Sequence, residues 1–177
     1  MPSWDHTFEN WLWRGAVRGG DAPDSPLSGT TTPAVVFDMD GVLSDASRRQ
    51  HFLEAPRRDW EAFFAACGED ELIAEVARLL DVIDDDHDIV LLTARPIRVM
   101  PQTLAWLDRY GLRWDLLIMR DFGDYTASPT FKRKSLGELR SREYDLRLGF
   151  EDDPRNVAMF HEEGVPCVYI HSGYHTT

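Results

Sequence analysis

The chain has 177 residues, of which 43% are hydrophobic, so it can bury the core of one domain. Its formal net charge of −12 argues against wrapping long nucleic acid, although it leaves room for a local pocket that grips one strand end. The sequence has no apolar run of about 18 residues, no signal-peptide pattern and no CxxC or zinc spacing. We therefore expect a cytoplasmic protein with no membrane span, no zinc site and reduced cysteines.

Residues 1–33 are predicted to be an N-terminal arm followed by a linker. Trp4, Trp11 and Trp13 stand among polar residues, a pattern that predicts a short helix whose aromatic face packs on the domain or on a partner. The stretch GGDAPDSPLSGTTTP that follows is rich in Gly, Pro, Ser and Thr and is typical of a linker. Residues 34–177 are therefore expected to form the domain.

Short apolar runs alternate with helical periodicity after the linker. Strands are predicted at 34–37, 88–92, 116–119, 146–150 and 166–170. Helices are predicted at 59–66, 70–80, 99–110, 131–139 and 154–163. Because the strands are apolar throughout and helices separate them, we predict an α/β fold with a doubly wound parallel sheet. This sheet has about five strands, helices on both faces and a small cap insert between its first two strands.

Polar residues follow the first four predicted strands, at the sheet edge where ligands bind in folds of this kind. These residues are Asp38, Asp40, Asp45, Thr93, Arg95, Arg120, Asp121, Asp124, Glu151, Asp152 and Asp153. The only two lysines of the chain, Lys132 and Lys134, come shortly after the third strand. We expect all these groups to converge on one edge of the sheet.

The carboxylates of FDMDGV and FEDDPRN would repel one another without a cation. Oxygen ligands in this number suit Mg²⁺, which keeps several waters and also binds substrate phosphate. Thr93 can offer a hydroxyl, and Lys132 or Lys134 an ammonium, to a phosphoryl oxygen. A carboxylate nucleophile, a second carboxyl group, a hard metal ion and a cationic clamp together indicate phosphoryl transfer.

Four segments in order (FDMDGV, LLTAR, a downstream lysine and FEDDPRN) resemble the motifs of the haloacid dehalogenase (HAD) superfamily across residues 34–170. The resemblance implies that Asp38 is a nucleophile that forms an aspartyl-phosphate and that Asp40 is the general acid and base. The residues it assigns to Mg²⁺ are Asp38, Asp40 through its carbonyl, Asp152 and, close by, Asp153. The residues it assigns to the phosphate are Thr93 and either Lys132 or Lys134.

Finer details resemble the phosphatase domain of polynucleotide kinase-phosphatases, which removes 3′-phosphates from nucleic-acid ends. Arg49 follows the first motif, Arg95 follows the TA pair of the second, and Asp124 precedes the lysines. By this resemblance both arginines contact the substrate and Asp124 supports the site. The alternatives are that the arginines pair with nearby carboxylates and that Asp124 is an ordinary turn residue. No kinase P-loop GxxxxGK[ST] occurs, so we expect the chain to work alone or with a separately encoded kinase.

The resemblance implies a Mg²⁺-dependent phosphomonoesterase that removes 3′-phosphates from nucleic-acid ends or nucleotides. The acidic composition motivates an alternative, a small-molecule HAD phosphatase such as a 5′-nucleotidase. A third hypothesis is a non-catalytic binding protein that keeps the fold.

Overall fold

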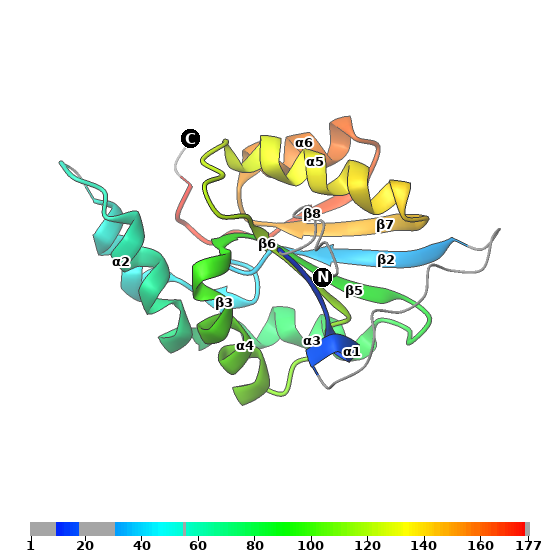
Figure 1. Ribbon diagram of the computed structural model, residues 1–177, viewed down its shortest axis with the longest axis horizontal. Helices are drawn as coiled ribbons and strands as arrows, with labels where there is room; N and C mark the ends of the chain where they lie inside the picture. The colour runs from blue at the N-terminus through cyan, green and yellow to red at the C-terminus, as the bar shows by residue number, and fades with distance from the viewer. Residues whose placement is uncertain (1–9, 18–30, 55, 176–177) are drawn as a thin grey trace, which may run out of the picture.

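The computed structural model describes residues 10–17, 31–54 and 56–175 and is built around one six-stranded sheet (Figure 1). The strands lie in the order β1-β6-β5-β2-β7-β8, and every neighbouring pair is parallel except the antiparallel pair β1–β6. The strands are β1 (Trp11–Trp13), β2 (Thr32–Phe37), β5 (Asp88–Pro96), β6 (Leu116–Arg120), β7 (Tyr144–Glu151) and β8 (Cys167–Tyr169). The predicted parallel α/β sheet is confirmed, with one strand more than expected.

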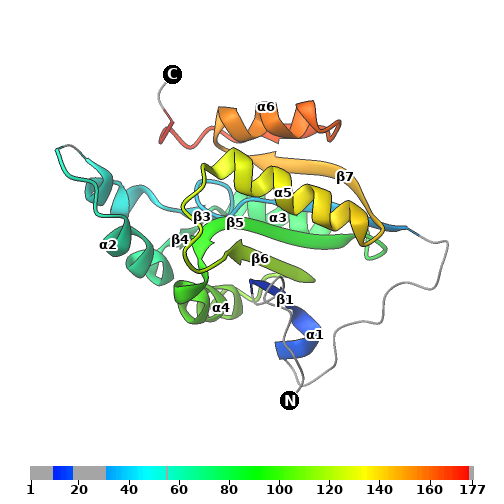
Figure 2. The same cartoon turned by 45° about the horizontal axis from the view of Figure 1, so that its top comes forward.

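Helices cover both faces of the sheet, as Figure 2 also shows from another side. The helices of the sheet are α3 (Ala74–Val82) and α4 (Met100–Arg109) on one face and α5 (Ser128–Ser141) and α6 (Pro154–Glu162) on the other. Strand β2 serves both cores because successive side chains point to opposite faces. Val35 and Phe37 pack with α3 and α4, whereas Ala34 and Val36 pack with α5 and α6.

A small insert follows β2 at the carboxyl end of the sheet, on the left in Figure 1. Its two short strands, β3 (Ser44–Asp45) and β4 (Glu71–Leu72), pair antiparallel. Between them lie the 3₁₀ helices η2 (Ser47–Leu53) and η3 (Ala66–Glu69) and helix α2 (Trp60–Ala65). The predicted cap insert is therefore confirmed, but the helix expected from residue 70 begins only at Ala74. Pairing with β3 takes the main chain of Glu71 and Leu72 into a strand instead.

In the part of the N-terminal arm that the structure describes, the prediction of a helix with an aromatic face is wrong. Trp11–Trp13 form strand β1, in which Trp11 pairs with Ile118 and Trp13 with Leu116. Aromatic residues fit a strand well, and this one bonds to the otherwise open edge of β6. A single helical turn, α1 (Arg14–Val17), follows. Trp4 lies outside the described residues, and the domain division after residue 33 stays a prediction.

None of the helices within the described ranges is long and apolar enough to cross a membrane. Cys67 and Cys167 are both free thiols. The cytoplasmic setting stays a prediction.

Candidate active site

Asp38 is the first residue after β2, the strand that lies between β5 and β7. Its main-chain N–H donates to the carbonyl oxygen of Phe150 at 3.0 Å, which continues the β2–β7 pairing by one residue. Lys132 of α5 reaches Asp38 from one face of the sheet, with 3.0 Å between Nζ and Oδ1. The same ammonium donates to Glu151 Oε1, and all three side chains are buried. The fold thus holds the predicted nucleophile against a buried cation.

Asp38, Glu151 and Asp152 lie so close that one oxygen from each falls within 4.8 Å of the others. Together with Lys132 they form what we call the acidic cluster. Burial raises the pKa of Asp38 well above its usual value; Glu151 and Asp152 raise it further, and Lys132 opposes them. Burial likewise raises the pKa of Glu151, against the effect of Lys132. One ammonium group cannot neutralise three carboxylates, so the acidic cluster has an excess of negative charge when its carboxylates are ionised.

The donor set of the acidic cluster fits a divalent cation. Oε2 of Glu151 and Oδ2 of Asp152 are buried and accept no hydrogen bond among the described residues, although His175 Nε2 lies 3.4 Å from the Asp152 oxygen. Orphaned carboxylate oxygens of this kind are costly unless a cation binds them. Oxygen ligands are those that Mg²⁺, Ca²⁺ and Mn²⁺ prefer. Asp38 and Asp152, both predicted ligands, would hold the ion, with Glu151 beside them.

Gly41 keeps the space next to Asp152 open. Its φ of +83° lies in the left-handed region that favours glycine. A Cβ at this position would also collide with the Asp152 carboxylate and press on Ser172. The glycine of FDMDGV therefore allows the loop after β2 to approach the acidic cluster closely.

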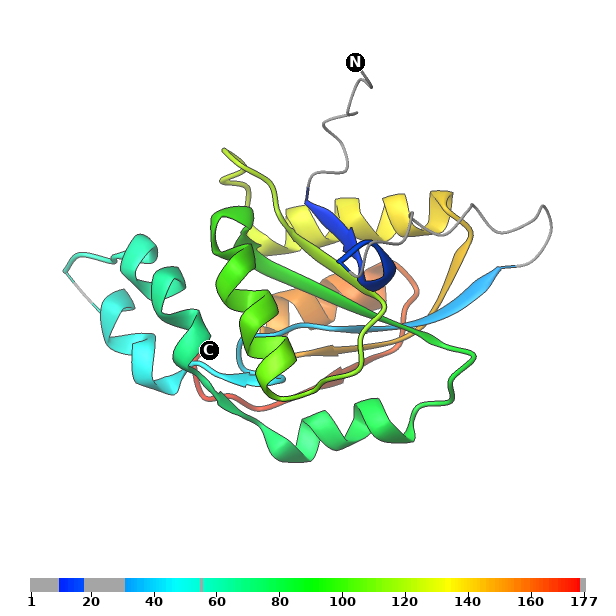
Figure 3. The same ribbon diagram turned by 60° about the horizontal axis from the view of Figure 1, so that its bottom comes forward.

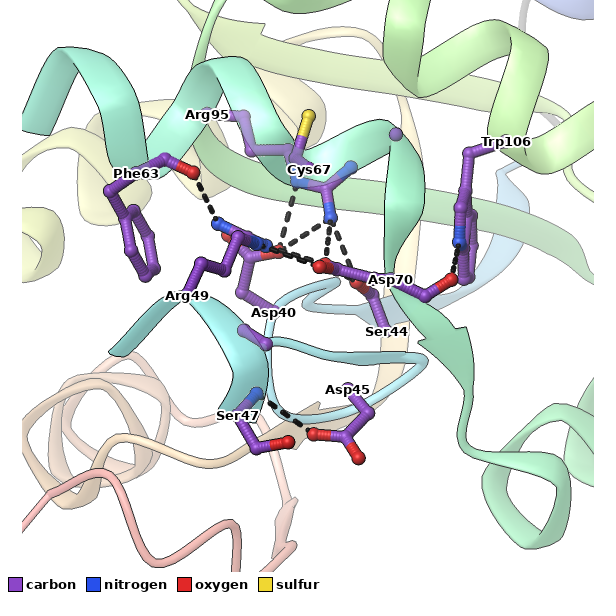
Figure 4. Close-up of polar contacts among 12 residues, drawn as sticks. Asp40, Ser44, Asp45, Ser47, Arg49, Phe63, Cys67, Asp70, Arg95 and Trp106 are labelled. Carbon is purple, nitrogen blue, oxygen red and sulfur yellow. Dashed lines mark hydrogen bonds and ion pairs between the residues drawn. The ribbon is translucent and has the colours of Figure 1, made fainter. Parts of the chain in front are cut away.

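Asp40 belongs to a second, different group, which we call the paired cluster (Figure 4). Its members are Asp40, Asp70, Arg49 and Arg95. Asp40 Oδ1 accepts from Arg49 Nη2 at 2.6 Å and from Arg95 Nη2 and Nε at 2.6 and 2.9 Å. Arg49 also donates from Nε and Nη2 to the two oxygens of Asp70, at 2.8 and 2.6 Å. Two guanidinium groups thus balance two carboxylates.

The balance of the paired cluster sets the protonation of Asp40. Burial tends to raise the pKa of Asp40, but Arg95 and Arg49 outweigh it and hold the pKa below its usual value. Asp40 is therefore ionised at neutral pH in this arrangement. Its side chain remains one-fifth exposed, so a substrate or a water can still reach the carboxylate.

Further bonds fix the two arginines from the insert and from α4. Arg49 donates to the carbonyl oxygen of Phe63 at 3.1 Å and lies over its ring, 4.3 Å from the centroid. Arg95 donates to Thr103 Oγ1 at 3.3 Å. The carbonyl oxygen of Asp70 accepts from Trp106 Nε1 at 2.8 Å. The cluster therefore joins the insert to the main domain.

The structure brings only some of the other predicted site residues to these clusters. Thr93 is buried near the carboxyl end of β5, where its Oγ1 accepts from the main-chain N–H of Arg95 at 3.2 Å. Lys134 points away from Asp38: it is 74% exposed and lies 3.7 Å from Glu138. Lys132 is thus the lysine at the site.

Asp153 and Asp124 make mainly structural contacts. Asp153 caps α6 through the N–H of Arg155 at 2.9 Å and forms an ion pair with the same residue at 2.7 Å. Asp124 accepts from the N–H and the hydroxyl of Thr126, at 2.9 and 2.7 Å, within its own loop. A metal contact of Asp153 and a supporting role of Asp124 stay predictions.

Arg49 and Arg95 form ion pairs with carboxylates, which is the arrangement predicted as the alternative to substrate contact. Arg49 is 2% and Arg95 0% exposed. A direct contact of either one with substrate stays a prediction.

Three residues near the site had no assigned role in the sequence analysis. Asp70 contacts Arg49 across 21 residues, and no local pattern marks such a contact. Glu151 was visible next to the acidic pair but had no evident partner. His175 lies 3.4 Å from Asp152, because the C-terminal segment folds back and Tyr174 donates to Asp45 at 2.8 Å. A lone histidine near the end of a sequence gives no such signal.

A comparison with protein families identifies the family to which the chain is similar. The family model described as "Polynucleotide kinase PNKP phosphatase domain" matches residues 32–175. No curated protein is similar enough in sequence to count as a match.

Solved structures share the fold at low sequence identity. A chain of the Pnkp1/Rnl/Hen1 RNA repair complex is similar with a TM-score of 0.67 and 24% identity, over 85% of this chain and 47% of that one. The class C acid phosphatase from Bacillus anthracis is similar with a TM-score of 0.58 and 17% identity, over 84% and 70%. A haloacid dehalogenase-like hydrolase from Streptococcus pneumoniae gives 0.51 and 14%, over 78% and 84%. The chain spans about half the length of the repair-complex chain that it matches.

Proposed function

The chain belongs to the polynucleotide kinase phosphatase-domain family of HAD-type phosphatases, and we propose that it removes 3′-phosphates from nucleic-acid ends. The family match over residues 32–175 carries this proposal and agrees with the resemblance drawn from the sequence motifs. The related chain in an RNA repair complex supports a role on nucleic acid. Whether a separately encoded kinase acts with this chain stays a prediction.

In the first half of the proposed reaction, a carboxylate oxygen of Asp38 attacks phosphorus. The bond from phosphorus to the 3′-oxygen breaks, and that oxygen takes a proton from Asp40. Asp40 must bind this proton before the step, because Arg49 and Arg95 favour its ionised form. Lys132, 3.0 Å from Asp38, is placed to hold a phosphoryl oxygen, and Thr93 is expected to assist. The products are the 3′-hydroxyl end and an aspartyl-phosphate on Asp38.

In the second half, Asp40 removes a proton from water, and the water oxygen attacks the phosphorus of the aspartyl-phosphate. This step needs an ionised Asp40, which is the form that Arg49 and Arg95 favour. The bond from Asp38 to phosphorus then breaks, releasing phosphate and restoring the carboxylate.

We propose Mg²⁺ as the divalent cation of the acidic cluster, held by Asp38 and Asp152. When bound, it offsets the negative charges of the carboxylates and of the phosphoryl group, which would otherwise repel each other.

Phosphate release from defined substrates tests the activity. The panel contains a 3′-phosphorylated oligonucleotide, its 5′-phosphorylated isomer, a 3′-nucleotide and a 5′-nucleotide, each with Mg²⁺ and with EDTA. We expect the 3′-phosphorylated end to give the highest kcat/KM. Asp38→Asn, purified in the same way, reveals any contaminating phosphatase.

The net charge of −12 favours a second candidate, a phosphatase of small molecules such as a 5′-nucleotidase. In that case the 5′-nucleotide would be cleaved faster than every oligonucleotide of the panel.

The acid role of Asp40 has a separate test. An aryl phosphate has a leaving group that needs no proton, whereas a 3′-phosphate leaves as an alkoxide unless it is protonated. Asp40→Asn should therefore slow cleavage of the 3′-phosphate much more than formation of the phospho-enzyme from the aryl phosphate. Equal losses on both substrates would assign Asp40 another role.

A further inference from the structure

Two aromatic side chains stand out in solvent on the loop between β6 and α5. Phe122 is 86% exposed and Tyr125 is 93% exposed, more than any other large hydrophobic side chain in the described parts of the chain. Figures 1 and 3 show this yellow-green loop at the same end of the sheet as β3 and the insert. Packing in the hydrophobic core therefore does not explain why aromatic residues occupy these two positions.

The loop that carries the rings is held by its own hydrogen bonds. Asp121 accepts from the main-chain N–H of Phe122 at 2.7 Å, and Gly123 allows the turn with a φ of +75°. Asp124 accepts twice from Thr126, and Arg120 donates to the carbonyl oxygen of the same threonine. The rings therefore project from an ordered turn, so little conformational entropy is lost when a ligand covers them.

Both ends of this loop are joined to the candidate active site. At its start, Arg120 pairs with Pro96 of β5 and donates from Nε to the carbonyl oxygen of Ala94, the residue after Thr93. At its end the chain enters α5, the helix that carries Lys132 to Asp38. A molecule whose terminal phosphate is bound at Asp38 can therefore extend past this loop.

We propose that Phe122 and Tyr125 stack on the bases next to the terminal phosphate of a single-stranded nucleic-acid 3′ end. The inference rests on the proposed function and names the part of the substrate that gives affinity. A chain with a net charge of −12 gains little from long-range attraction to phosphates, whereas stacking on a base needs no charge. The loop neighbours Asp121, Gly123 and Asp124 are polar or small, so the rings do not extend into a continuous apolar patch of the kind that proteins bind.

The test compares a 3′-phosphorylated single-stranded oligonucleotide with an oligonucleotide of the same length whose last residues are abasic. For Phe122→Ala and Tyr125→Ala we expect KM on the base-bearing substrate to rise about 5- to 150-fold relative to KM on the abasic one. Phe122→Tyr and Tyr125→Phe keep a ring and should keep the wild-type ratio. Val82→Ala removes an exposed apolar side chain at the far end of α3 and serves as the matched control.

An unchanged ratio, or an equal rise in KM on both substrates, would overturn the proposal. The proposal is also overturned if the wild type is a dimer and the variant with both alanines is a monomer that keeps the wild-type KM. The rings would then bind a second copy of the chain. Anisotropy of a fluorescent oligonucleotide bound to Asp38→Asn protein separates this inference from the proposed activity. If the wild type releases no 3′-phosphate but Phe122→Ala still weakens this binding, the activity is wrong and the stacking surface stands.

Discussion

The acidic cluster and the paired cluster begin two residues apart in the sequence, at Asp38 and Asp40, yet differ in charge balance. Around Asp38 three buried carboxylates face one ammonium, which leaves two negative charges when these four groups are ionised and His175, 3.4 Å from Asp152, is neutral. Around Asp40 two carboxylates face two guanidinium groups and no charge is left over. The pKa of Asp38 is accordingly raised by burial, and that of Asp40 is lowered by its arginines despite burial.

This difference separates a site that needs a ligand from one that is complete. With a neutral His175, the excess of two negative charges in the acidic cluster equals the charge of one divalent cation. The paired cluster needs nothing further and fixes the position of Asp40. Each cluster can be perturbed by single substitutions, with opposite expected effects on stability.

The largest effect is expected from Asp38→Asn. Removing the nucleophile should lower kcat at least about 10³-fold. The same change should raise the free energy of unfolding of the metal-free protein by roughly 1 to 3 kcal/mol, because one unbalanced buried charge disappears. Urea denaturation in EDTA measures the stability, and Asp85→Asn at an exposed site is the control. A loss of stability in Asp38→Asn would contradict the assigned charge imbalance.

Arg95→Met should have the next largest effect. It removes one cation from the balanced, buried group and leaves Asp40 and Asp70 with Arg49 alone. We expect the free energy of unfolding to fall by about 3 to 5 kcal/mol, as for other broken buried ion pairs. Arg98→Met, at an exposed position three residues further on, should change it by less than about 0.5 kcal/mol. Similar results for the two variants would show that the paired cluster contributes little to stability.

Metal binding should stabilise the protein through the acidic cluster. At a Mg²⁺ concentration of about 100 times Kd, the expected gain is about 2.7 kcal/mol, seen as a rise in Tm. Asp152→Asn should reduce this gain, whereas Asp81→Asn, at an exposed position on α3, should not. An equal rise of Tm in both variants would place the ion elsewhere.

The pH dependence of stability should show the smallest effect, with two opposite parts. Asp38 has a raised pKa, so the metal-free protein gains stability as the pH falls from that pKa toward 3.8. Asp40 has a lowered pKa, so its contribution is present above pH 3.8 and is lost as the pH falls through the folded-state value. Urea denaturation of Asp38→Asn should lack the gain. In Asp40→Asn the loss of stability below pH 3.8 should be smaller than in the wild type.

Much of this arrangement could be predicted from the sequence because it depends on local patterns. Apolar runs marked the central strands, and the residues after them mark the sheet edge where Asp38, Thr93 and Asp152 lie. Helix spacing could also have selected the lysine. Lys132 stands four residues before Leu136 and seven before Leu139, on the buried face of α5, whereas Lys134 faces Glu138 in solvent.

The remaining features depend on contacts between distant segments. Strand β1 has three residues and is recognisable only by its pairing with β6. The two-residue strands β3 and β4 are too short for any periodicity. Asp70 looked like the first residue of a helix, and its bond to Arg49 exists only because the insert folds back over the loop after β2. Arginine and aspartate are common surface residues, so composition does not reveal that these are buried.

The pairing of β1 with β6 has a consequence for how the protein is produced. The family match begins at residue 32, after β1, so expression boundaries chosen from that match would omit Trp11–Trp13. The outer main-chain groups of β6 would then be unpaired, and the core around Ile118 would lose the cover of Trp11. Open strand edges recruit strands from other molecules. Recombinant protein that starts at residue 32 should therefore be less monodisperse than the full chain.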